Sequence, residues 1–406
     1  MKKRIIYIVC ILLVLVACAP NEKKDEVVKE DEAKKQTPSI VPSYKLSKDN
    51  YKTILPFRPS KARGVITNQV ANRLDIVEVE EGLIRHSKEV FDPEKYYYEE
   101  GQYLTESMVY DWLGRTLTKD QLKKEKEKQI KQLEEDGKTV DEEKIEAELQ
   151  QGLNPKIEDD GDKKAHEESP RYLSHIVEQN YLTKKDDDSV ELAGVSIGLA
   201  LKSVYRYQTE TGGPYYYEEI SKEEIEKQGN KIAERVLDRL RKIEGLENVP
   251  IMIALYQEEE QGSPVPGNFF AKTTVSGGED TVGKWESINE EYVLFPSERA
   301  KKKYYDDAEV VSSFGKDIGE YFPNYVGVIG EGLYINDELR KMTIEIPIEF
   351  NGESEIIGFT QYAYGLVKEM FSDYYDLEIK VTSRKQIESV IYREAGTEDP
   401  VVHIFH

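Results

Sequence analysis

Cysteine is nearly absent from this chain. Of its 406 residues only Cys10 and Cys18 carry a thiol, and both lie close to the N-terminus. The rest of the chain therefore has no thiol for a disulfide, a zinc–thiolate site or a cysteine nucleophile. Any role for a cysteine must belong to the N-terminal segment.

Basic residues are also in deficit. Lys and Arg number 56 against 79 Asp and Glu, which gives a formal net charge of −23. A protein that binds nucleic acid or an anionic lipid surface through its side chains needs clustered Lys and Arg, so we set nucleic acid aside as a partner. At about 150 residues per domain, the length favours two folded domains.

Histidine is sparse and forms no H-E-x-x-H motif. His403-x-x-His406 resembles an exposed pair in a disordered terminal tail. The acidic runs Glu158 to Asp162 and Asp186 to Asp188 could hold Ca²⁺ weakly, but neither has the twelve-residue EF-hand loop, which favours solvated turns. We therefore expect no metal and no cofactor. The remaining histidines are His86, His166 and His175.

The N-terminus has the features of a lipoprotein leader. Residues 2–4 are basic, and the run Ile5 to Val16 has no charged side chain. A spanning helix needs about 20 apolar residues, so this run is short for an anchor and suits a secretory signal. It ends in Leu15-Val16-Ala17-Cys18, which matches the bacterial lipobox.

A cysteine at this place has a physical purpose. Its thiolate can be alkylated by a diacylglyceryl group, and cleavage between Ala17 and Cys18 then leaves a lipidated N-terminus. One acyl chain binds a membrane marginally, whereas two hold stably. We predict that Cys18 anchors the protein on the outer face of the cytoplasmic membrane after lipoprotein-processing enzymes act. The alternative is an ordinary signal peptide with an incidental cysteine.

The chain divides into four parts. Residues 1–17 are the signal peptide, and 18–43, rich in Lys and Glu with three prolines beyond Cys18, form a disordered tether. An N-terminal domain at 44–275 contains a charged helical insertion at about 118–164. A C-terminal domain at 276–406 completes the chain.

Periodicity predicts the elements of both domains. A helix at 70–91 has an apolar stripe, and another begins at the N-cap Ser221. "LAGVSIGLALKSVYRY" is typical of a long buried strand. The order β-α-β-β recurs from Met342, which fits either a duplication or chance. The fold class is α+β, with mainly antiparallel sheets. The stripe consists of Val70, Leu74, Val77, Ile84 and Phe91.

Two glycine motifs invite a catalytic or nucleotide-binding interpretation. Gly194 to Gly198 reads G-x-S-x-G, so Ser196 could be a hydrolase nucleophile. The motif lies inside an apolar run after a poor core strand, which favours a buried serine between two glycines. Gly327 to Gly332 is not the dinucleotide fingerprint, and we expect a loop with unusual backbone angles.

Tyrosine is in excess, with 27 residues and the string "YYYEE" at Tyr96 to Glu100 and again at Tyr215 to Glu219. Exposed tyrosines can stack on sugars or apolar peptides, which suits a glycan-binding or peptide-binding surface. They also serve as half-buried strand residues. Both interpretations stay open.

Several segments resemble a known family. The lipobox, "KLSKDNYKTILPFRPSKARGVITNQVANRLDIVEVEEGL", "YLSHIVEQNYL", "ELAGVSIGLAL", "YFPNYVGVIGEGLY" and "EIIGFTQYAYG" are similar to the CamS family of Gram-positive sex-pheromone-precursor lipoproteins. The likeness runs from about Lys45 to Arg393, apart from the charged stretch at 118–164. It implies that the last seven or eight residues of the leader are released as a peptide that reaches a receptor on another cell.

By position, the peptide would begin at Cys10 or Ile11 and end at Ala17. It lacks the phenylalanine and the terminal serine of the family's heptapeptide. We expect a non-enzymatic, lipid-anchored lipoprotein that yields this peptide; a glycan- or peptide-binding module, or more weakly a Ser196 hydrolase, are the alternatives. The shorter candidate is Ile11, Leu12, Leu13, Val14, Leu15, Val16 and Ala17.

Overall fold

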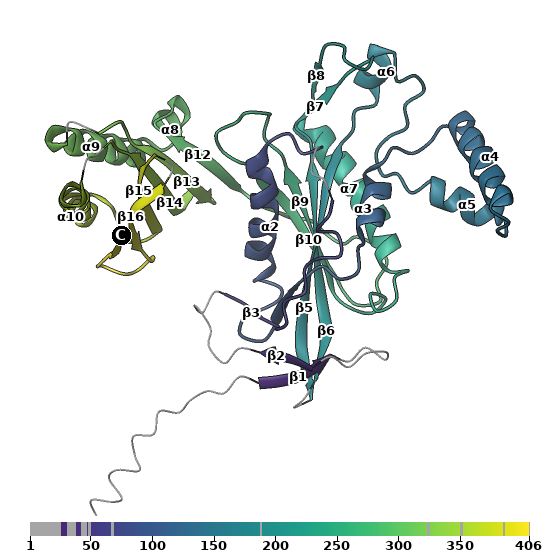
Figure 1. The fold of residues 1–406 in the computed structure, drawn as a ribbon, viewed down its shortest axis with the longest axis horizontal. Helices are drawn as coiled ribbons and strands as arrows, with labels where there is room; N and C mark the ends of the chain where they lie inside the picture. The colour runs from purple at the N-terminus through teal and green to yellow at the C-terminus, as the bar shows by residue number, and fades with distance from the viewer. Residues whose placement is uncertain are drawn as a thin grey trace, which may run out of the picture.

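The computed structural model describes residues 26–30, 38–41, 47, 50–65, 69–186, 189–322, 325–349, 352–384 and 386–405. Within these ranges helices accompany two large, mainly antiparallel sheets, which confirms the expected α+β class (Figure 1). The leader, the candidate peptide that ends at Ala17 and the lipobox residue Cys18 lie outside the described residues.

The first sheet forms the centre of the N-terminal half and follows the order β11-β10-β9-β6-β5-β4-β3, with β1 and β2 added beside β6. Its neighbouring strands run antiparallel except for β1–β6, β3–β4 and β6–β9. Most of β6 and nearly all of β9 are buried, as expected for parallel strands covered on both faces. The strands are β1 (Glu26–Glu30), β2 (Pro38–Val41), β3 (Lys52–Thr53), β4 (Tyr97–Glu100), β5 (Leu173–Asp186), β6 (Ser189–Leu201), β9 (Ile251–Gln257), β10 (Asn268–Val275) and β11 (Glu286–Ser287).

The second sheet has the order β12-β13-β14-β15-β16-β17, in which only β14 and β15 are parallel. Side chains alternate along β15, so that Leu377, Ile379 and Val381 are buried on one face. A short hairpin of β7 and β8 stands apart from both sheets. These strands are β7 (Val204–Tyr207), β8 (Tyr216–Glu219), β12 (Glu290–Phe295), β13 (Ile329–Ile335), β14 (Glu338–Pro347), β15 (Asp376–Ser383), β16 (Gln386–Arg393) and β17 (Val401–Ile404).

Both halves repeat one topology. In each half, three antiparallel strands lead through a helix to a fourth strand parallel to the third, and two further antiparallel strands follow. The crossover helix is α7 (Lys222–Leu240) in the first half and α10 (Glu353–Met370) in the second. The sequence indicated two β-α-β-β units, and the structure extends their likeness to six strands, β4-β5-β6-β9-β10-β11 and β12 to β17.

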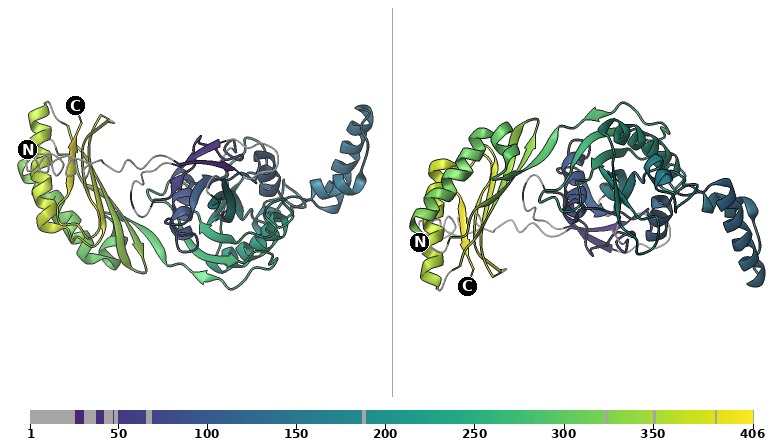
Figure 2. Two further views of the ribbon diagram at one scale, coloured as in Figure 1. Left: turned by 90° about the horizontal axis from the view of Figure 1, so that it is seen from below. Right: turned by 90° about the horizontal axis from the view of Figure 1, so that it is seen from above.

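The helices pack where their apolar faces require. Ser221 Oγ accepts a hydrogen bond from the N–H of Glu224, which begins α7 as expected, and Ile225, Val236 and Leu240 turn into the core. Helices α9 and α10 lie on the same face of the second sheet (Figure 2). The remaining helices are α2 (Arg73–Ser87), α3 (Glu106–Leu113), α4 (Lys119–Glu135), α5 (Glu142–Leu149), α6 (Lys163–Glu168), α8 (Glu298–Lys303) and α9 (Tyr305–Tyr321).

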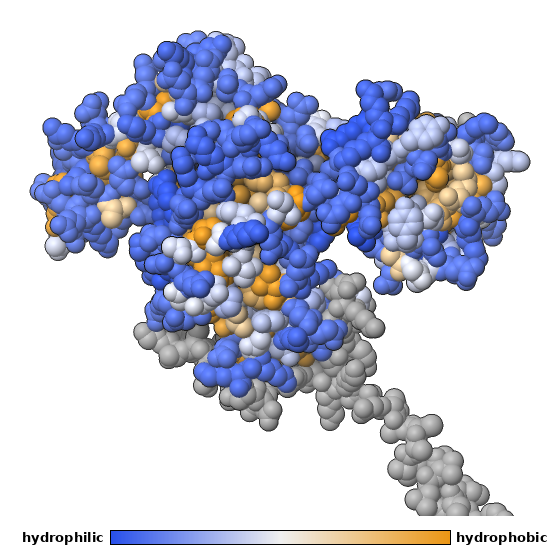
Figure 3. Space-filling model, turned by 180° about the vertical axis from the view of Figure 1, so that it is seen from behind, coloured by the Kyte–Doolittle hydropathy of each residue, from blue (hydrophilic) through white to orange (hydrophobic). Residues whose placement is uncertain are grey.

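The charged insertion forms the projecting helices that the sequence predicts. Helices α4 and α5 extend away from the body (Figures 1 and 2), and α4 buries none of its own residues. Lys126 joins the two helices through ion pairs with Glu142 and Glu146, both at 3.1 Å. At the base of the arm, the N–H of Thr116 donates to the carbonyl of Asn154 at 2.8 Å. Hydrophilic side chains cover the arm, whereas apolar ones gather on the central body (Figure 3).

Helix α2 exists as expected but buries a different face. Leu74 and Val77 of the predicted stripe are exposed, while Asp75, Glu78 and Leu83 are buried. The reason is that α2 lies between the two halves. Its apolar side chains border a cavity of about 210 Å³ whose other wall belongs to the second sheet.

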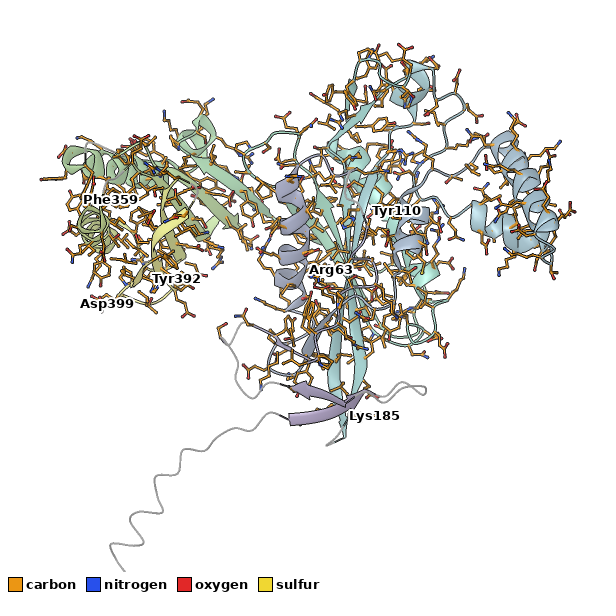
Figure 4. All side chains as sticks on the ribbon, in the orientation of Figure 1. Arg63, Tyr110, Lys185, Phe359, Tyr392 and Asp399 are labelled. Carbon is orange, nitrogen blue, oxygen red and sulfur yellow. The ribbon has the colours of Figure 1, made fainter. Side chains whose placement is uncertain are left out.

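Four further expectations differ from the structure. Within the expected tether, residues 26–30 and 38–41 form strands, because the long β5–β6 hairpin offers an edge for pairing; Figure 4 labels Lys185 at this end of β5. Residues 401–404 are strand β17 rather than a disordered tail, since they pair with β16. The first sheet continues to Ser287, past the boundary expected at 275 and 276.

The fourth difference is Gly327 to Gly332, which was expected to be a loop. Gly330 and Gly332 lie in β13 without a positive φ. Both lie in tight packing, because a Cβ on either would lie within 3.2 Å of the Phe295 side chain. The expectation of unusual backbone angles is therefore wrong.

An ion cluster joins the two halves. Arg85 of α2 contacts Glu78 at 2.6 Å and Glu290, the first residue of β12, at 3.1 Å. His86 Nε2 lies 3.0 Å from the same Glu290 carboxylate, and Tyr292 donates a hydrogen bond to Glu78 at 2.5 Å. These groups hold the second sheet against α2.

Candidate functional site

A cavity of about 680 Å³ opens at the carboxyl ends of the parallel strands β6 and β9. Four parts of the chain line it: residues 69–71 before α2, the segment from Asp160 to Arg171 before β5, the segment from the end of β6 through β7 and β8, and the loop after β9. Ligands of open α/β sheets commonly bind outside the carboxyl ends of parallel strands. The volume is within the usual range for small-molecule sites, roughly 300–1,000 Å³.

Three basic side chains line this cavity: Arg171, Lys202 and Arg206. Lys202 is buried, lies 3.8 Å from the carboxylate of Glu258 and donates to the carbonyl of Gln69. Within the described part of the chain, neither arginine forms an ion pair. Burial and the charge of a neighbouring arginine lower the pKa of Arg171, whose Nη1 donates to a backbone carbonyl 3.1 Å away.

An aromatic column forms one wall. The ring of Tyr207 stacks on His166 at 4.4 Å and on Tyr205 at 5.2 Å between ring centroids. Tyr205 accepts a hydrogen bond from Arg115 at 2.9 Å, and its hydroxyl lies 2.9 Å from His166 Nδ1. Because all three rings are buried, they fix the wall rather than offer a free stacking surface. The exposed ring at the cavity is that of Tyr217.

The acidic run 158–162 positions this wall. Asp162 caps α6 by accepting from the N–H of Lys164, and the carbonyl of Asp160 lies 2.8 Å from His166 Nε2. The run is a turn, as the sequence indicated. Its Asp160 side chain is exposed at the rim, where Glu260 adds a second carboxylate.

Ser196 lies in the interior of β6, away from any strand-to-helix turn. It is fully buried, and its Oγ lies 3.0 Å from the Tyr181 hydroxyl. A Cβ on Gly194 would meet the ring of Phe91 at 2.0 Å, which explains why glycine precedes the serine. His403 lies in β17 of the other half, and the structure does not bring it to Ser196.

The other predicted candidates are dispersed. Asp186 ends β5, whereas the two aspartates after it and His406 lie outside the described residues. Of the two "YYYEE" strings, 96–100 contains β4 of the first sheet, and 215–219 reaches the cavity through Tyr217. Within the described residues, no three His, Cys, Asp or Glu side chains are grouped so as to hold a metal ion.

A second cavity of about 260 Å³ lies on the first half, beside Arg63, which Figure 4 labels. Its floor includes Glu178, whose carboxylate accepts backbone N–H groups from Gln102, Tyr103 and Leu104. His175 also lines it, with a buried Nδ1 that has no hydrogen-bond partner among the described residues.

The basic residues of the larger cavity escaped the sequence reasoning. They come from a segment before β5 and from both sides of the break between β6 and β7, so no motif spacing unites them. A weak signal existed, since Lys202 directly follows a long apolar run. The sequence analysis predicted one long buried strand, "LAGVSIGLALKSVYRY", that continues through Lys202.

The arrangement suits binding, because it joins a concave surface to convergent polar groups.

None of the helices in the described residues combines the length and the apolar character that crossing a bilayer requires. A search of the curated proteins found no match.

Comparisons with a family model and with solved structures agree. The model described as CamS sex pheromone cAM373 precursor matches residues 57–399. The sex pheromone precursor of Lactobacillus salivarius subsp. salivarius UCC118 is 29% identical with a TM-score of 0.77, and covers 89% of this chain and 98% of its own. The C-terminal domain of the staph-cAM373 precursor of Staphylococcus aureus is 28% identical with a TM-score of 0.69, and covers 84% and 99%. This chain belongs to the CamS family of sex pheromone precursors.

Proposed function

We propose that this precursor is a lipoprotein anchored through Cys18 to the outer face of the cytoplasmic membrane of a Gram-positive bacterium. The support is the leader itself, in which a basic start, a short apolar run and the Leu-Val-Ala-Cys tetrapeptide occur together. Two acyl chains on one cysteine supply enough buried CH₂ groups, at about 0.8 kcal/mol each, for stable attachment. Membership of the family agrees with this role.

The anchor is tested by Cys18→Ala in growing cells. We expect radiolabelled palmitate to enter the parent protein but not the variant, and we expect the variant to leave the membrane fraction. Cys10→Ala is the matched control, because it removes the other thiol and leaves the lipobox intact. A Cys18→Ala protein that still incorporates palmitate would contradict the proposal.

We propose further that the cleaved leader yields a short peptide, Ile11 to Ala17 or Cys10 to Ala17, which acts on a receptor of another cell. All its side chains are uncharged and nearly all are apolar, so the peptide can partition into membranes. Mass spectrometry of culture supernatant should detect a peptide ending at Ala17. Cys18→Ala should abolish it, since cleavage follows lipidation. If the parent strain releases no such peptide, the signalling role fails.

A second role for the folded body is favoured by the 680 Å³ cavity. We propose that the body is a non-catalytic surface module that binds a small ligand there, with the exposed ring of Tyr217 at the cavity. Ser196 is inaccessible in β6, which disfavours a hydrolase built on it. Fluorophosphonate labelling that depends on Ser196 would count against a non-catalytic body.

A further inference from the structure

We propose that the cavity at the carboxyl ends of β6 and β9 binds its ligand through one oxyanion, a phosphate or a carboxylate group, held by Arg171 and Arg206. The inference rests on the proposed binding role of the body and names the chemistry of the ligand. It concerns the folded half of the protein and not the peptide.

The charge of the cavity is opposite to that of the protein. The chain carries a formal charge of −23, yet three basic side chains converge here. Lys202 is paired with Glu258, whereas neither arginine forms an ion pair among the described residues, and the carboxylate that attracts Arg171 is the exposed Asp160 at the rim. Arg171 is partly buried, and a partly buried charge without a counterion is costly, so an incoming anion would gain attraction without first breaking an ion pair.

Neutral groups hold both guanidinium groups in place. Arg171 Nη1 donates to the carbonyl of Leu113 at 3.1 Å, and Arg206 Nη1 donates to Gln261 Oε1 at 2.9 Å. The guanidinium of Arg206 also lies over the ring of Tyr215, 4.3 Å from its centroid. A guanidinium has five N–H donors in a planar fork, and these contacts leave donors for a bidentate oxyanion.

The burial of Arg171 strengthens the preference of the cavity for an anion. Loss of solvent and the charge of Arg115 lower the pKa of Arg171, which means that the site is electropositive and partly dry. An anion would offset the repulsion between Arg115 and Arg171, and its charge-assisted hydrogen bonds would be stronger where water is excluded.

The rim limits what can enter. Asp160 and Glu260 are exposed carboxylates at the cavity, and both would repel a second negative group. A ligand with one anionic end and an uncharged body therefore fits better than a polyanion. Nucleic acid would need many more phosphate contacts than three basic groups supply. The exposed ring of Tyr217 is available to pack on the uncharged part.

The test is calorimetric titration of the mature chain, residues 18–406, made without the leader. Glycerol phosphate and glucuronate are the anionic probes, and glycerol and glucose are their neutral counterparts. We expect at least one anionic probe to bind tenfold or more tightly than its neutral counterpart, with an affinity that falls as salt rises. Comparison of glycerol phosphate with glucuronate distinguishes a phosphate ligand from a carboxylate ligand.

Arg206→Gln should weaken that binding about tenfold or more, because it removes charged donors. Arg206 is exposed, so the variant should fold as the parent does. Arg171→Gln should act in the same direction. Arg340→Gln is the matched control, since it makes the same charge change at an exposed pair with Glu338 in the other half and should leave the affinity unchanged.

Other results would overturn the inference. Binding of neutral probes alone would keep the binding module and reject the oxyanion. Equal affinity of the parent and Arg206→Gln for the anionic probes, or no binding of either anionic probe, would also reject it. The anchor is judged separately by palmitate labelling, which none of these results affects.

Discussion

Replacing Arg85 by alanine is expected to lower the free energy of unfolding by about 3–5 kcal/mol, because it leaves two buried carboxylates without their cation. The side chain of Glu290 is fully buried and that of Glu78 nearly so, and the Arg85 guanidinium lies between them. Removing the whole ion cluster would cost less than removing its cation alone. The loss should therefore exceed that of any exposed ion pair.

The pKa shifts of the two carboxylates agree with this view. Burial raises the pKa of Glu78, against the opposing charge of Arg85. Burial would also raise the pKa of Glu290, but His86 and Arg85 outweigh it and lower the pKa below its usual value. Without Arg85 both groups would bind protons more readily in the folded state. The loss of stability should therefore be larger at pH 7 than at pH 5.

Denaturant unfolding of the variant and the parent measures the effect. Arg340→Ala is the control, because its contact with Glu338 is half exposed and should be worth less than about 1 kcal/mol. A loss below that level for Arg85→Ala would mean that water or a moving neighbour compensates the two carboxylates. The cluster would then have no structural role between the halves.

Acidification from pH 6.5 to pH 4 is expected to cost the parent about 3 kcal/mol through His175 alone. Burial lowers the pKa of this imidazole to about 4, against a usual value of 6.5. The unfolded chain therefore binds a proton in this window, whereas the folded chain does not. The contribution of His175 is fully present above pH 6.5 and is lost as the pH falls toward 4.

Other groups act in the opposite direction, so the measurement is a difference. Burial raises the pKa of Asp75 to about 7, which favours the folded state at low pH and lessens its stability as the pH rises from about 4 to 7. His175→Gln removes only the contribution of this imidazole to the pH dependence of stability. Its stability relative to the parent should rise by about 3 kcal/mol between pH 6.5 and pH 4.

His403→Gln is the matched control, because this histidine is exposed in β17 and a change there should leave the acid profile of the parent intact. Unfolding curves at a series of pH values compare the three proteins. Parallel profiles for His175→Gln and the parent would show that the histidine is protonated in the folded state. The second cavity would then admit water to its ring.

The sequence predicted those elements that depend on local order. A capped start was enough for α7, and the strand–helix order that recurs from Met342 was enough for β14, α10 and β15. The local pattern predicted the wrong buried face for α2. Asp75 and Glu78 are buried there because Tyr256 and Tyr292, on distant strands, donate hydrogen bonds to them. Such partners are invisible in a local pattern. Gly332 was misjudged for the same reason, since the side chains that crowd it include Leu339 of β14 and Phe295 of β12.

The candidate site was harder to predict than the fold. Tyr217 was singled out as part of a string, but Arg171 and Arg206 were not, because their chemistry arises from meeting at the ends of two parallel strands. The overall acidity of the chain even pointed away from an electropositive site. A total charge cannot reveal a local excess of the opposite sign.

The base of the projecting arm has a consequence for how the family can diverge. The chain leaves the body at Thr116 and returns at Asn154, and the two passes are held together by backbone hydrogen bonds, among them Thr116 N–H to the Asn154 carbonyl at 2.8 Å and Asn154 N–H to the Gly114 carbonyl at 3.0 Å. A segment inserted between two such closely spaced points can be lengthened, trimmed or exchanged while the sheets keep their register. An arm of another length or sequence at this position would therefore leave both sheets unchanged.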